Sequence, residues 1–384
     1  MRHKWRKLSD VAEVNPRRPV ILRSDDELTS FVPMASVDAV EGVIATPELK
    51  PYSKVQKGFT YFQNNDVIFA KITPCMQNGK HALVLDMIDG FGFGSTEFHV
   101  IRAGKEVCPE WIHFFLRRKE TLDAAVKTFK GAVGQQRVPT DFLENIVLPC
   151  PLVEDQRRIA VQLKAQLAEV EKARKAAKLQ LSEITKLCNS IIFDSLKKGM
   201  PSPHLLSDVL IEVKKGIGES WASFPVLGAT RAGLAPAKEP PGKYPYKYKP
   251  VVPGTVFYNP MRILIGSIAF VDDGGESGIT SPDYVVLRGK EGVVDSRWFY
   301  YWLRSPLGEQ CITSLARGAV RERMLFKRLA KGVVELPDFN VQQNASVALA
   351  ELKPMCEAIK KQLKEIDLLP QKILSEAFGD GNAN

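Results

Sequence analysis

The chain has 384 residues, of which 45% are hydrophobic and 25% charged, and this composition excludes an intrinsically disordered protein. Fifty-three Lys and Arg residues against 44 Asp and Glu residues leave a net charge of +9, which favours a polyanionic partner. Six widely spaced cysteines, no clustered histidines, no signal-peptide core and no long apolar run predict a cytoplasmic protein with no metal site and no membrane span.

The sequence contains an internal repeat whose marks return in the same order at an offset of about 187 residues. These marks are KLSDVAEV and LLSDVLIEV, GSTEFHVIR and ITSPDYVVLR, EWIHFFLRR and RWFYYWLRS, FKGAVGQQRV and LARGAVRERM, and NIVLPCPLVEDQRRIA and GVVELPDFNVQQNASVA. Each copy closes with a strand-like stretch, a proline and a helical segment, which predicts two globular units that are each followed by a helix. Gene growth alone produces such a repeat; a pseudo-twofold molecule facing a twofold partner such as duplex DNA is the other explanation, and the basic charge favours it.

The predicted fold class is α/β, with two pseudo-symmetric α/β domains separated by two long antiparallel helices that form a coiled-coil stalk. The predicted boundaries are 1–152 for the first domain, 153–199 for the central helix, 200–340 for the second domain and 341–384 for the C-terminal helix. In the first domain, residues 66–72 and 98–101 resemble strands. Residues 109–119 resemble a helix whose aromatic side chains have the spacing of a core face: Trp111, Phe114 and Phe115.

A long helix is predicted from Asp155 to about Leu196, a stretch with no proline or glycine. Its apolar or small side chains recur at a mean spacing of about 3.6 residues, the period of one helical stripe. They are Ile159, Leu163, Leu167, Val170, Ala173, Ala177, Leu181, Ile184, Cys188 and Ile191. About 40 residues at about 1.5 Å each give a rod of about 60 Å, and its stripe needs a second long helix to cover it.

The second domain repeats this plan, with strands expected at 255–258, 263–271 and 284–287 and an aromatic core helix at 295–303. The second long helix is expected from about Gln342 to Phe378, with a stripe formed by Leu349, Leu352, Ile359, Leu363, Ile366 and Leu369. Pro354 and Pro370 lie inside this pattern, and each removes a backbone donor, so we expect a bent or broken helix.

Basic residues interleaved with aromatic and amide side chains are the candidates for DNA contact, because Arg and Lys neutralise phosphates while Arg, Asn and Gln pair with base edges. In the first domain they are Lys54, Lys57, Lys71, Thr73, Gln77, Asn78, Lys80, Gln135, Gln136 and Arg137, with Lys50 and Tyr52 beside them. In the second domain they are Lys243, Tyr244, Tyr246, Lys247, Lys249, Arg262, Arg317, Arg321 and Arg323. A charged loop is more often only solvated, so no single residue of this set is assigned to a base.

The sequence lacks the motifs of an enzyme that would act on DNA by itself. Asn259-Pro260-Met261-Arg262 follows a predicted strand but lacks the second proline and the aromatic residue with which methyltransferases grip a flipped base. No glycine-rich cofactor turn precedes it, and neither a clustered-carboxylate nuclease motif nor a phosphate-binding loop is present. The chain is therefore predicted to be a binding protein with no catalytic residues and no cofactor of its own.

The marks NDVIFAKITPCMQNGKHALV, GSTEFHVIR and LPCPLVEDQRRIA ahead of a long helix resemble the specificity subunit of type I restriction-modification systems. LARGAVRERM, VELPDF and the closing ILSEAFG extend the resemblance over essentially the whole chain. Two departures stand out. Asp155-Gln156 replaces the usual Glu-Gln pair, whereas the second repeat has Gln343-Asn344, and the second helix is shorter by about five residues and contains Pro354.

The resemblance implies two target-recognition domains that each read one half of a bipartite, asymmetric site in double-stranded DNA. It also implies that the helices are a ruler and a docking surface for two modification subunits, which resemble N6-adenine methyltransferases and bring S-adenosylmethionine. Restriction subunits would add ATP-dependent translocation and magnesium-dependent cleavage. The helix positions assigned to this docking surface are Ile159, Leu163, Leu167, Val170, Leu181, Ile184, Leu349, Leu352, Ile359, Leu363 and Ile366.

Two other hypotheses belong to different classes. One is a scaffold unrelated to DNA whose coiled stalk spaces two interaction domains, and it predicts no appreciable salt dependence of binding to random duplex DNA. The other is a self-sufficient DNA methyltransferase, which predicts that the isolated chain crosslinks to the methyl-donor cofactor.

Overall fold

The computed structural model describes residues 4–132, 134–316 and 323–379. The chain forms two compact units: unit 1 comprises Met1–Ala176 and Leu363–Asn384, and unit 2 comprises Ala177–Gln362. Each unit therefore holds one globular domain and one segment of each long helix, and we call the globular parts domain 1 and domain 2. Within the described residues, no helix is both long enough and apolar enough to cross a membrane.

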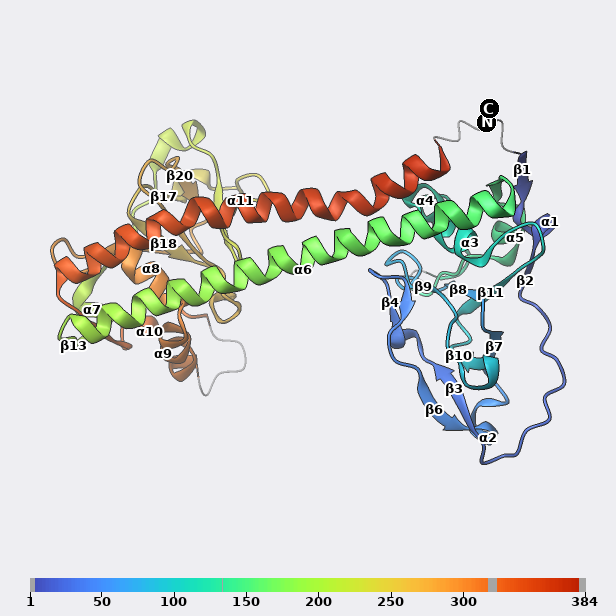
Figure 1. The fold of residues 1–384 in the computed structure, drawn as a ribbon. Helices are drawn as coiled ribbons and strands as arrows, with labels where there is room; N and C mark the ends of the chain where they lie inside the picture. The colour runs from blue at the N-terminus through green and yellow to red at the C-terminus, as the bar shows by residue number, and fades with distance from the viewer. Residues whose placement is uncertain (1–3, 133, 317–322, 380–384) are drawn as a thin grey trace. The chain divides into compact units, whose positions relative to one another are not determined.

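Domain 1 is built on an antiparallel sheet in which β8 (Asp66–Ala70) lies between β11 (Phe98–Ala103) and β9 (His81–Leu83), with β2 (Ala12–Val14) on the far side of β11 (Figure 1). Every residue of β8 is buried, as expected for a continuous apolar run at the centre of a sheet. The predicted strand 66–72 is confirmed but ends at Ala70, so that Lys71 and the residues after it form a loop.

A second sheet in domain 1 has the order β6-β3-β10-β7, in which β3 and β10 are parallel. The strands are β3 (Leu28–Val32), β6 (Glu48–Pro51), β7 (Thr60–Gln63) and β10 (Phe91–Gly94), with α2 (Tyr52–Val55) following β6 and a short ribbon of β4 (Val37–Asp38) and β5 (Val43–Ile44) nearby. Gly92 and Gly94 are required in β10, because a Cβ atom on either would lie 2.9 Å from the ring of Phe62.

Domain 2 repeats the first sheet with the order β14-β21-β18-β19. Its strands are β14 (Leu210–Glu212), β18 (Thr255–Tyr258), β19 (Ile268–Val271) and β21 (Val285–Gly289), and two small sheets add β15 (Leu227–Thr230) with β16 (Gly233–Pro236) and β17 (Lys249–Val251) with β20 (Gly278–Thr280). The prediction of one strand over 263–271 is wrong at its start. Ile263–Ile265 form a 3-10 turn that ends at Gly266, whose φ of 80° suits glycine.

The aromatic helices of the two domains are α3 (Pro109–Leu116) and α8 (Ser296–Arg304), and the predicted core role of their rings is confirmed. Trp111 and Trp298 are 1% and 0% exposed. The remaining short helices are α1 (Leu8–Val11), α4 (Lys119–Val126) and α5 (Thr140–Asn145) in domain 1, and α7 (Leu206–Val209), α9 (Pro306–Ala316) and α10 (Phe326–Leu329) in domain 2. Each domain is closed by a two-stranded sheet, β1 (Lys4–Lys7) with β12 (Val147–Cys150), and β13 (Ser202–Leu205) with β22 (Val333–Leu336).

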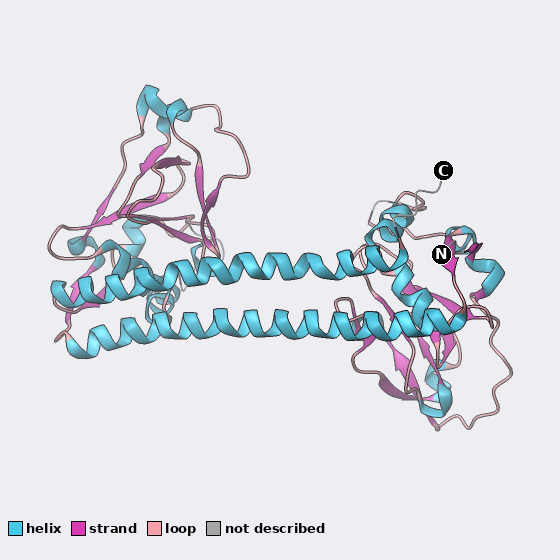
Figure 2. Cartoon of the chain, turned by 45° about the horizontal axis from the view of Figure 1, so that its top comes forward, coloured by secondary structure: helices cyan, strands magenta, loops and turns pink. Residues whose placement is uncertain are grey.

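The long helices are α6 (Val153–Lys198) and α11 (Phe339–Phe378), and in each unit their segments lie side by side (Figures 1 and 2). The segments are antiparallel. In unit 1 the guanidinium of Arg174 bonds Asp367 at 2.9 Å, and Leu163 shares a hydrophobic core with Leu374, so partner numbers on α11 rise as they fall on α6.

Two expectations for these helices are corrected. Ala173 and Leu369 were predicted to belong to the buried stripes, but Ala173 is exposed and Leu369 is 39% exposed. The buried side chain at this point of α6 is that of Arg174, which is 9% exposed. In addition, α11 continues through both prolines. Pro354 is exposed, so the carbonyl that loses its helical donor there can be hydrated, and packing of the other helix face keeps the backbone helical.

The start of α6 is held to domain 1 by an amide clamp. Gln156, which is 0% exposed, accepts a hydrogen bond from the backbone N–H of Cys108 at 2.9 Å. Its amide nitrogen donates to the carbonyl oxygens of Glu106 at 2.9 Å and Pro151 at 2.8 Å. Cys108 is the residue before α3, so the clamp joins the beginnings of two helices.

The same clamp recurs in unit 2, where Gln342 is 1% exposed. It accepts from the backbone N–H of Asp295 at 3.0 Å and donates to the carbonyl oxygens of Val293 at 3.0 Å and Pro337 at 2.8 Å. The counterpart of Gln156 is therefore Gln342, and the assignment of Gln343-Asn344 to the Asp155-Gln156 pair is wrong by two residues. Gln343 and Asn344 are both exposed.

Each domain also receives the C-terminal end of the other domain's helix. In unit 1, Phe378 of α11 packs on Trp111 with ring centroids 4.3 Å apart, and Gln371 bonds the backbone of Lys119 and Arg117. In unit 2, Ser195 of α6 accepts a 2.9 Å hydrogen bond from the indole of Trp298. Both domains thus share one plan, in which two helix ends close one core.

Candidate nucleic-acid interface

Domain 1 brings three chain segments together where β8 ends and β11 begins. The N–H of Lys71 donates to the carbonyl of Glu97, and the N–H of Val138 donates to the carbonyl of Lys71, both at 2.9 Å. The N–H of Thr73 donates to the carbonyl of Gln136, also at 2.9 Å. We call the segments 71–73 and 136–138, joined in this way, loop junction 1; it unites four of the predicted residues, namely Lys71, Thr73, Gln136 and Arg137.

The side chain of Arg137 is already engaged within loop junction 1. Its Nε and Nη2 atoms contact the two carboxylate oxygens of Glu97 at 2.9 and 2.7 Å, and Nη1 donates to the carbonyl of Gln135 at 3.1 Å. The hydrogen bond from Arg137 lowers the pKa of Glu97, so this carboxylate is ionised near neutral pH. The prediction of Arg137 as a base contact needs a free guanidinium edge, and the Nε–Nη2 edge is occupied.

Domain 2 contains the matching arrangement, loop junction 2, formed by Pro260 and residues 323–324. The N–H of Met324 donates to the carbonyl of Pro260 at 3.1 Å, as that of Val138 does to Lys71. Arg323 lies 3.2 Å from Asp283, as Arg137 lies beside Glu97. Arg262 is exposed near this junction, while the predicted residues Arg317 and Arg321 lie outside the described part of the chain.

Two predicted lysines serve the protein's own backbone. Lys80 donates to the carbonyls of Met34 and Val37 at 3.0 and 2.9 Å. Lys249 donates to the carbonyl of Tyr284 at 2.7 Å, and burial lowers its pKa. These contacts hold the loops in place, and they make both lysines less available to a phosphate than the sequence suggests. By contrast, the predicted side chains of Gln77, Asn78 and Gln135 are exposed.

A second basic group lies on the other sheet of domain 1. Lys54 and Lys57, both predicted, are exposed on and just after α2. The sequence reading missed Arg18, whose guanidinium lies 4.8 Å from the ring centre of Phe93 and bonds the hydroxyl of Tyr52. In the sequence, the Arg-Arg pair between two prolines at 16–19 is the feature that would have indicated a basic site here.

In domain 2 the predicted tyrosine–lysine run forms an exposed aromatic and cationic cluster. Tyr244 and Tyr246 are 48% and 42% exposed, and their rings meet edge to face at 6.1 Å. Lys247 and Lys243 lie 4.9 and 5.5 Å from the ring centre of Tyr244. Such a cluster combines a stacking surface with positive charge, the chemistry that nucleic acids select.

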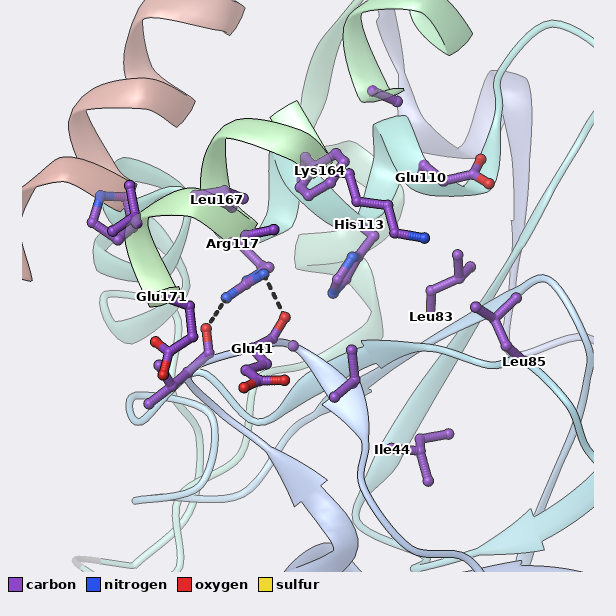
Figure 3. A pocket seen from close by; sticks show the side chains of 18 of the residues that line it. Glu41, Ile44, Leu83, Leu85, Glu110, His113, Arg117, Lys164, Leu167 and Glu171 are labelled. Atoms are coloured by element: carbon purple, nitrogen blue, oxygen red, sulfur yellow. Dashed lines mark hydrogen bonds between the residues drawn. The ribbon is translucent and has the colours of Figure 1, made fainter. Parts of the chain in front are cut away.

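A pocket of about 1050 Å³ in unit 1 lies between the β4–β5 ribbon, α3 and the first half of α6 (Figure 3). Its floor is apolar, with Ile44, Leu83 and Leu167, while Arg117 donates to the carbonyls of Glu41 and Val40 at one edge. Burial, together with the nearby charge of Arg117, lowers the pKa of His113 to about 3. The described lining contains no serine, threonine or cysteine, so it offers no hydroxyl or thiol nucleophile.

The apolar stripe that was assigned to partner docking is turned inward. Leu163, Val170, Leu349 and Ile366 are 0–8% exposed, and Ile159, Leu167, Leu181, Ile184, Leu352, Ile359 and Leu363 are half-buried. The apolar side chains that these helices expose are others: Val161, Leu179, Leu187, Val347, Met355 and Leu368, which are 47–71% exposed. A docking partner would therefore meet this second set.

The core sheet, aromatic helix, amide clamp and loop junction recur at matching positions, and together they define a duplicated α/β protein with one basic loop junction per domain. Residues 3–181 match the model of the type I restriction modification DNA specificity domain. The family model thus matches just under half of the chain, and the resemblance predicted from the sequence is confirmed.

Two curated relatives are from Escherichia coli. The chain is 33% identical over 159 residues to the type I restriction enzyme EcoAI specificity subunit, and 34% identical over 156 residues to the EcoEI specificity subunit. These matches cover 41% and 40% of this chain. The chain spans about a quarter of the length of the relatives that it matches, 27% and 26%.

Solved structures share the fold over almost the whole chain. A chain from work on the "complex assembly and conformational transition of the type I R-M system" has a TM-score of 0.66 at 18% identity, over 98% of this chain and 97% of that one. The type I restriction-modification system S subunit from M. genitalium has a TM-score of 0.51 at 13% identity, over 98% and 97% of the two chains. The predicted α/β fold with two long helices is confirmed.

Proposed function

We propose that this protein is the DNA-specificity subunit of a type I restriction-modification complex and works in the cytoplasm. Residues 1–152 and 200–340 each read one half of a bipartite site in double-stranded DNA, and residues 153–199 and 341–384 are the spacer helices. The protein catalyses no reaction itself. Its partners are two modification subunits, which methylate the DNA, and restriction subunits.

The observation that carries the proposal is the matched pair of loop junctions. Each repeat presents a loop junction just after the strand at the centre of its core sheet, held by three backbone hydrogen bonds in domain 1 and by the bond from Met324 to Pro260 in domain 2. The exposed side chains beside the two junctions differ, with Gln77 and Asn78 in one domain and Arg262 in the other. Two domains that recognise different half-sites require the same scaffold with different exposed side chains, because it is the exposed side chains that contact base edges.

The charge and the helices support the same function. A net charge of +9 and the cation–tyrosine cluster at 243–247 favour contact with phosphates and unstacked or groove-exposed bases. Helix α6 has 46 residues, so its backbone rises about 69 Å, about two turns of B-DNA. We infer that the helices set the gap between the half-sites, and that the apolar side chains exposed on them are where modification subunits dock.

The test is selection from a pool of random-sequence duplexes by the full chain assembled with its modification subunits. We expect two short conserved motifs at a fixed separation, and affinity for random duplex that falls steeply as salt rises. A scaffold unrelated to DNA would select no motif and show no salt slope. Exchanging residues 200–340 for those of another specificity subunit should change one motif only.

A further inference from the structure

We propose that Glu97 and Arg137 form a latch that holds loop junction 1 in its DNA-reading geometry, and that Asp283 and Arg323 form the corresponding, weaker latch in loop junction 2. This inference rests on the DNA-reading function proposed above. It makes both arginines positioning residues, which act through the loops beside them and do not read bases.

The latch strengthens a junction that is held by few backbone hydrogen bonds. Only the bonds of Thr73 and Val138 join segment 71–73 to segment 136–138, and a bridge between residues 130 and 137 continues the ladder on its other side. The ion pair of Arg137 ties this ladder to Glu97 at the entrance of β11, whose carbonyl already accepts from the N–H of Lys71. One side-chain pair therefore links all three segments at the point where the exposed loop begins.

Three of the five N–H groups of the guanidinium are used in this arrangement. Its Nε–Nη2 edge faces both oxygens of Glu97, and Nη1 donates to the carbonyl of Gln135. A bidentate contact with guanine through the Nε–Nη2 edge would require Arg137 to break the latch. The backbone of Glu97 is also held in place, because its N–H donates to the hydroxyl of Ser95 at 3.2 Å.

Loop junction 2 repeats the acid–arginine pair of the latch at an offset of 186 residues, which is the difference between 283 and 97 and between 323 and 137. The N–H of Asp283 donates to the hydroxyl of Ser281 at 3.4 Å, as that of Glu97 does to Ser95. Two independent surface pairs rarely coincide in a repeat that has otherwise diverged, so the recurrence indicates a role.

The two latches differ in strength. The side chains of Arg137 and Glu97 are 43% and 23% exposed and make two contacts, whereas those of Arg323 and Asp283 are 54% and 72% exposed and make one, at 3.2 Å. Solvent screens an exposed single contact more than a partly shielded bidentate one. Breaking the first latch should therefore affect DNA reading more than breaking the second.

The experiment uses the full chain assembled with its modification subunits and the duplex that it selects from a random pool. Glu97→Gln should weaken binding to that duplex about tenfold, equivalent to about 1.4 kcal/mol, and relax the motif read by domain 1 only. Asp283→Asn, the matched control, should weaken binding threefold or less. Arg137→Gln should lose more than E97Q, because it leaves an unpaired carboxylate beside DNA, and the double variant E97Q/R137Q should regain part of that loss.

Hydrogen exchange of the peptide amides at 71–73 and 136–138 supplies the second measurement. It should be faster in E97Q while exchange in domain 2 stays unchanged, which also shows that the variant is folded. If E97Q binds as tightly as the unaltered chain or more tightly while R137Q loses affinity, Arg137 contacts DNA directly and the latch is refuted. If the unaltered chain selects no motif at all, the proposed function fails, whereas faster exchange in E97Q would still establish the latch as a structural device.

Discussion

Replacing Gln156 by leucine tests whether the amide clamp determines how α6 begins. The side chain is 0% exposed and makes three hydrogen bonds, to Cys108, Glu106 and Pro151. Leucine has a similar volume but cannot form any of them, so three buried backbone groups lose their partner. At a net value of about 1 kcal/mol per hydrogen bond, the loss is about 3 kcal/mol.

Hydrogen exchange followed by mass spectrometry measures this locally, because a single unfolding midpoint is poorly defined for a chain of two units. The amides around Cys108 and the first turn of α6 should exchange more than 100-fold faster in Q156L, since about 1.4 kcal/mol corresponds to a factor of ten. Glu154→Ala, at an exposed position in the same helical turn, is the control and should leave exchange unchanged. Exchange in Q156L within threefold of the unaltered chain would show that the clamp contributes nothing, and the same comparison applies to Gln342→Leu in unit 2.

Three further outcomes are expected. His113 is neutral in the folded chain because burial lowers its pKa to about 3, whereas the unfolded chain binds a proton there below about pH 6.5. The free energy of unfolding should therefore decrease by about 1.4 kcal/mol for each unit by which the pH falls between these two values, and His113→Phe should reduce this slope in pH-dependent denaturation. An unchanged slope in His113→Phe would show that the imidazole is protonated in the native state. Pro354→Ala restores a backbone donor inside the continuous helix α11 and should raise the stability of unit 2 by about 1–3 kcal/mol; faster hydrogen exchange of the amides around residue 354 would contradict this. Arg262→Ala should weaken binding to all duplexes equally and reduce the salt slope by about 0.9 if it contacts a phosphate, and a loss confined to one base position would instead assign it to base reading.

Long-range periodicity in the sequence determined the architecture. The repeat predicted two matched domains, the 3.6-residue stripe predicted α6 and α11, and the dense aromatic spacing predicted the buried helices α3 and α8. These signals are reliable because hydrophobic burial acts on many residues at once, so single departures do not change the result. The stretch at 263–265 shows the limit, since an apolar triplet is compatible with a strand and with a turn, and Gly266 decides for the turn.

Only the tertiary structure decided which polar side chains are free. Arg137 and Glu97 are 40 residues apart, and nothing local in the sequence distinguishes a paired arginine from one that awaits a phosphate. Likewise, Lys80 and Lys249 read as surface charges yet donate to carbonyls of their own domain, and the clamp selects Gln342 over its neighbour Gln343. Hydrogen bonds need atoms at a fixed distance and angle, and that geometry exists only after distant segments have packed together.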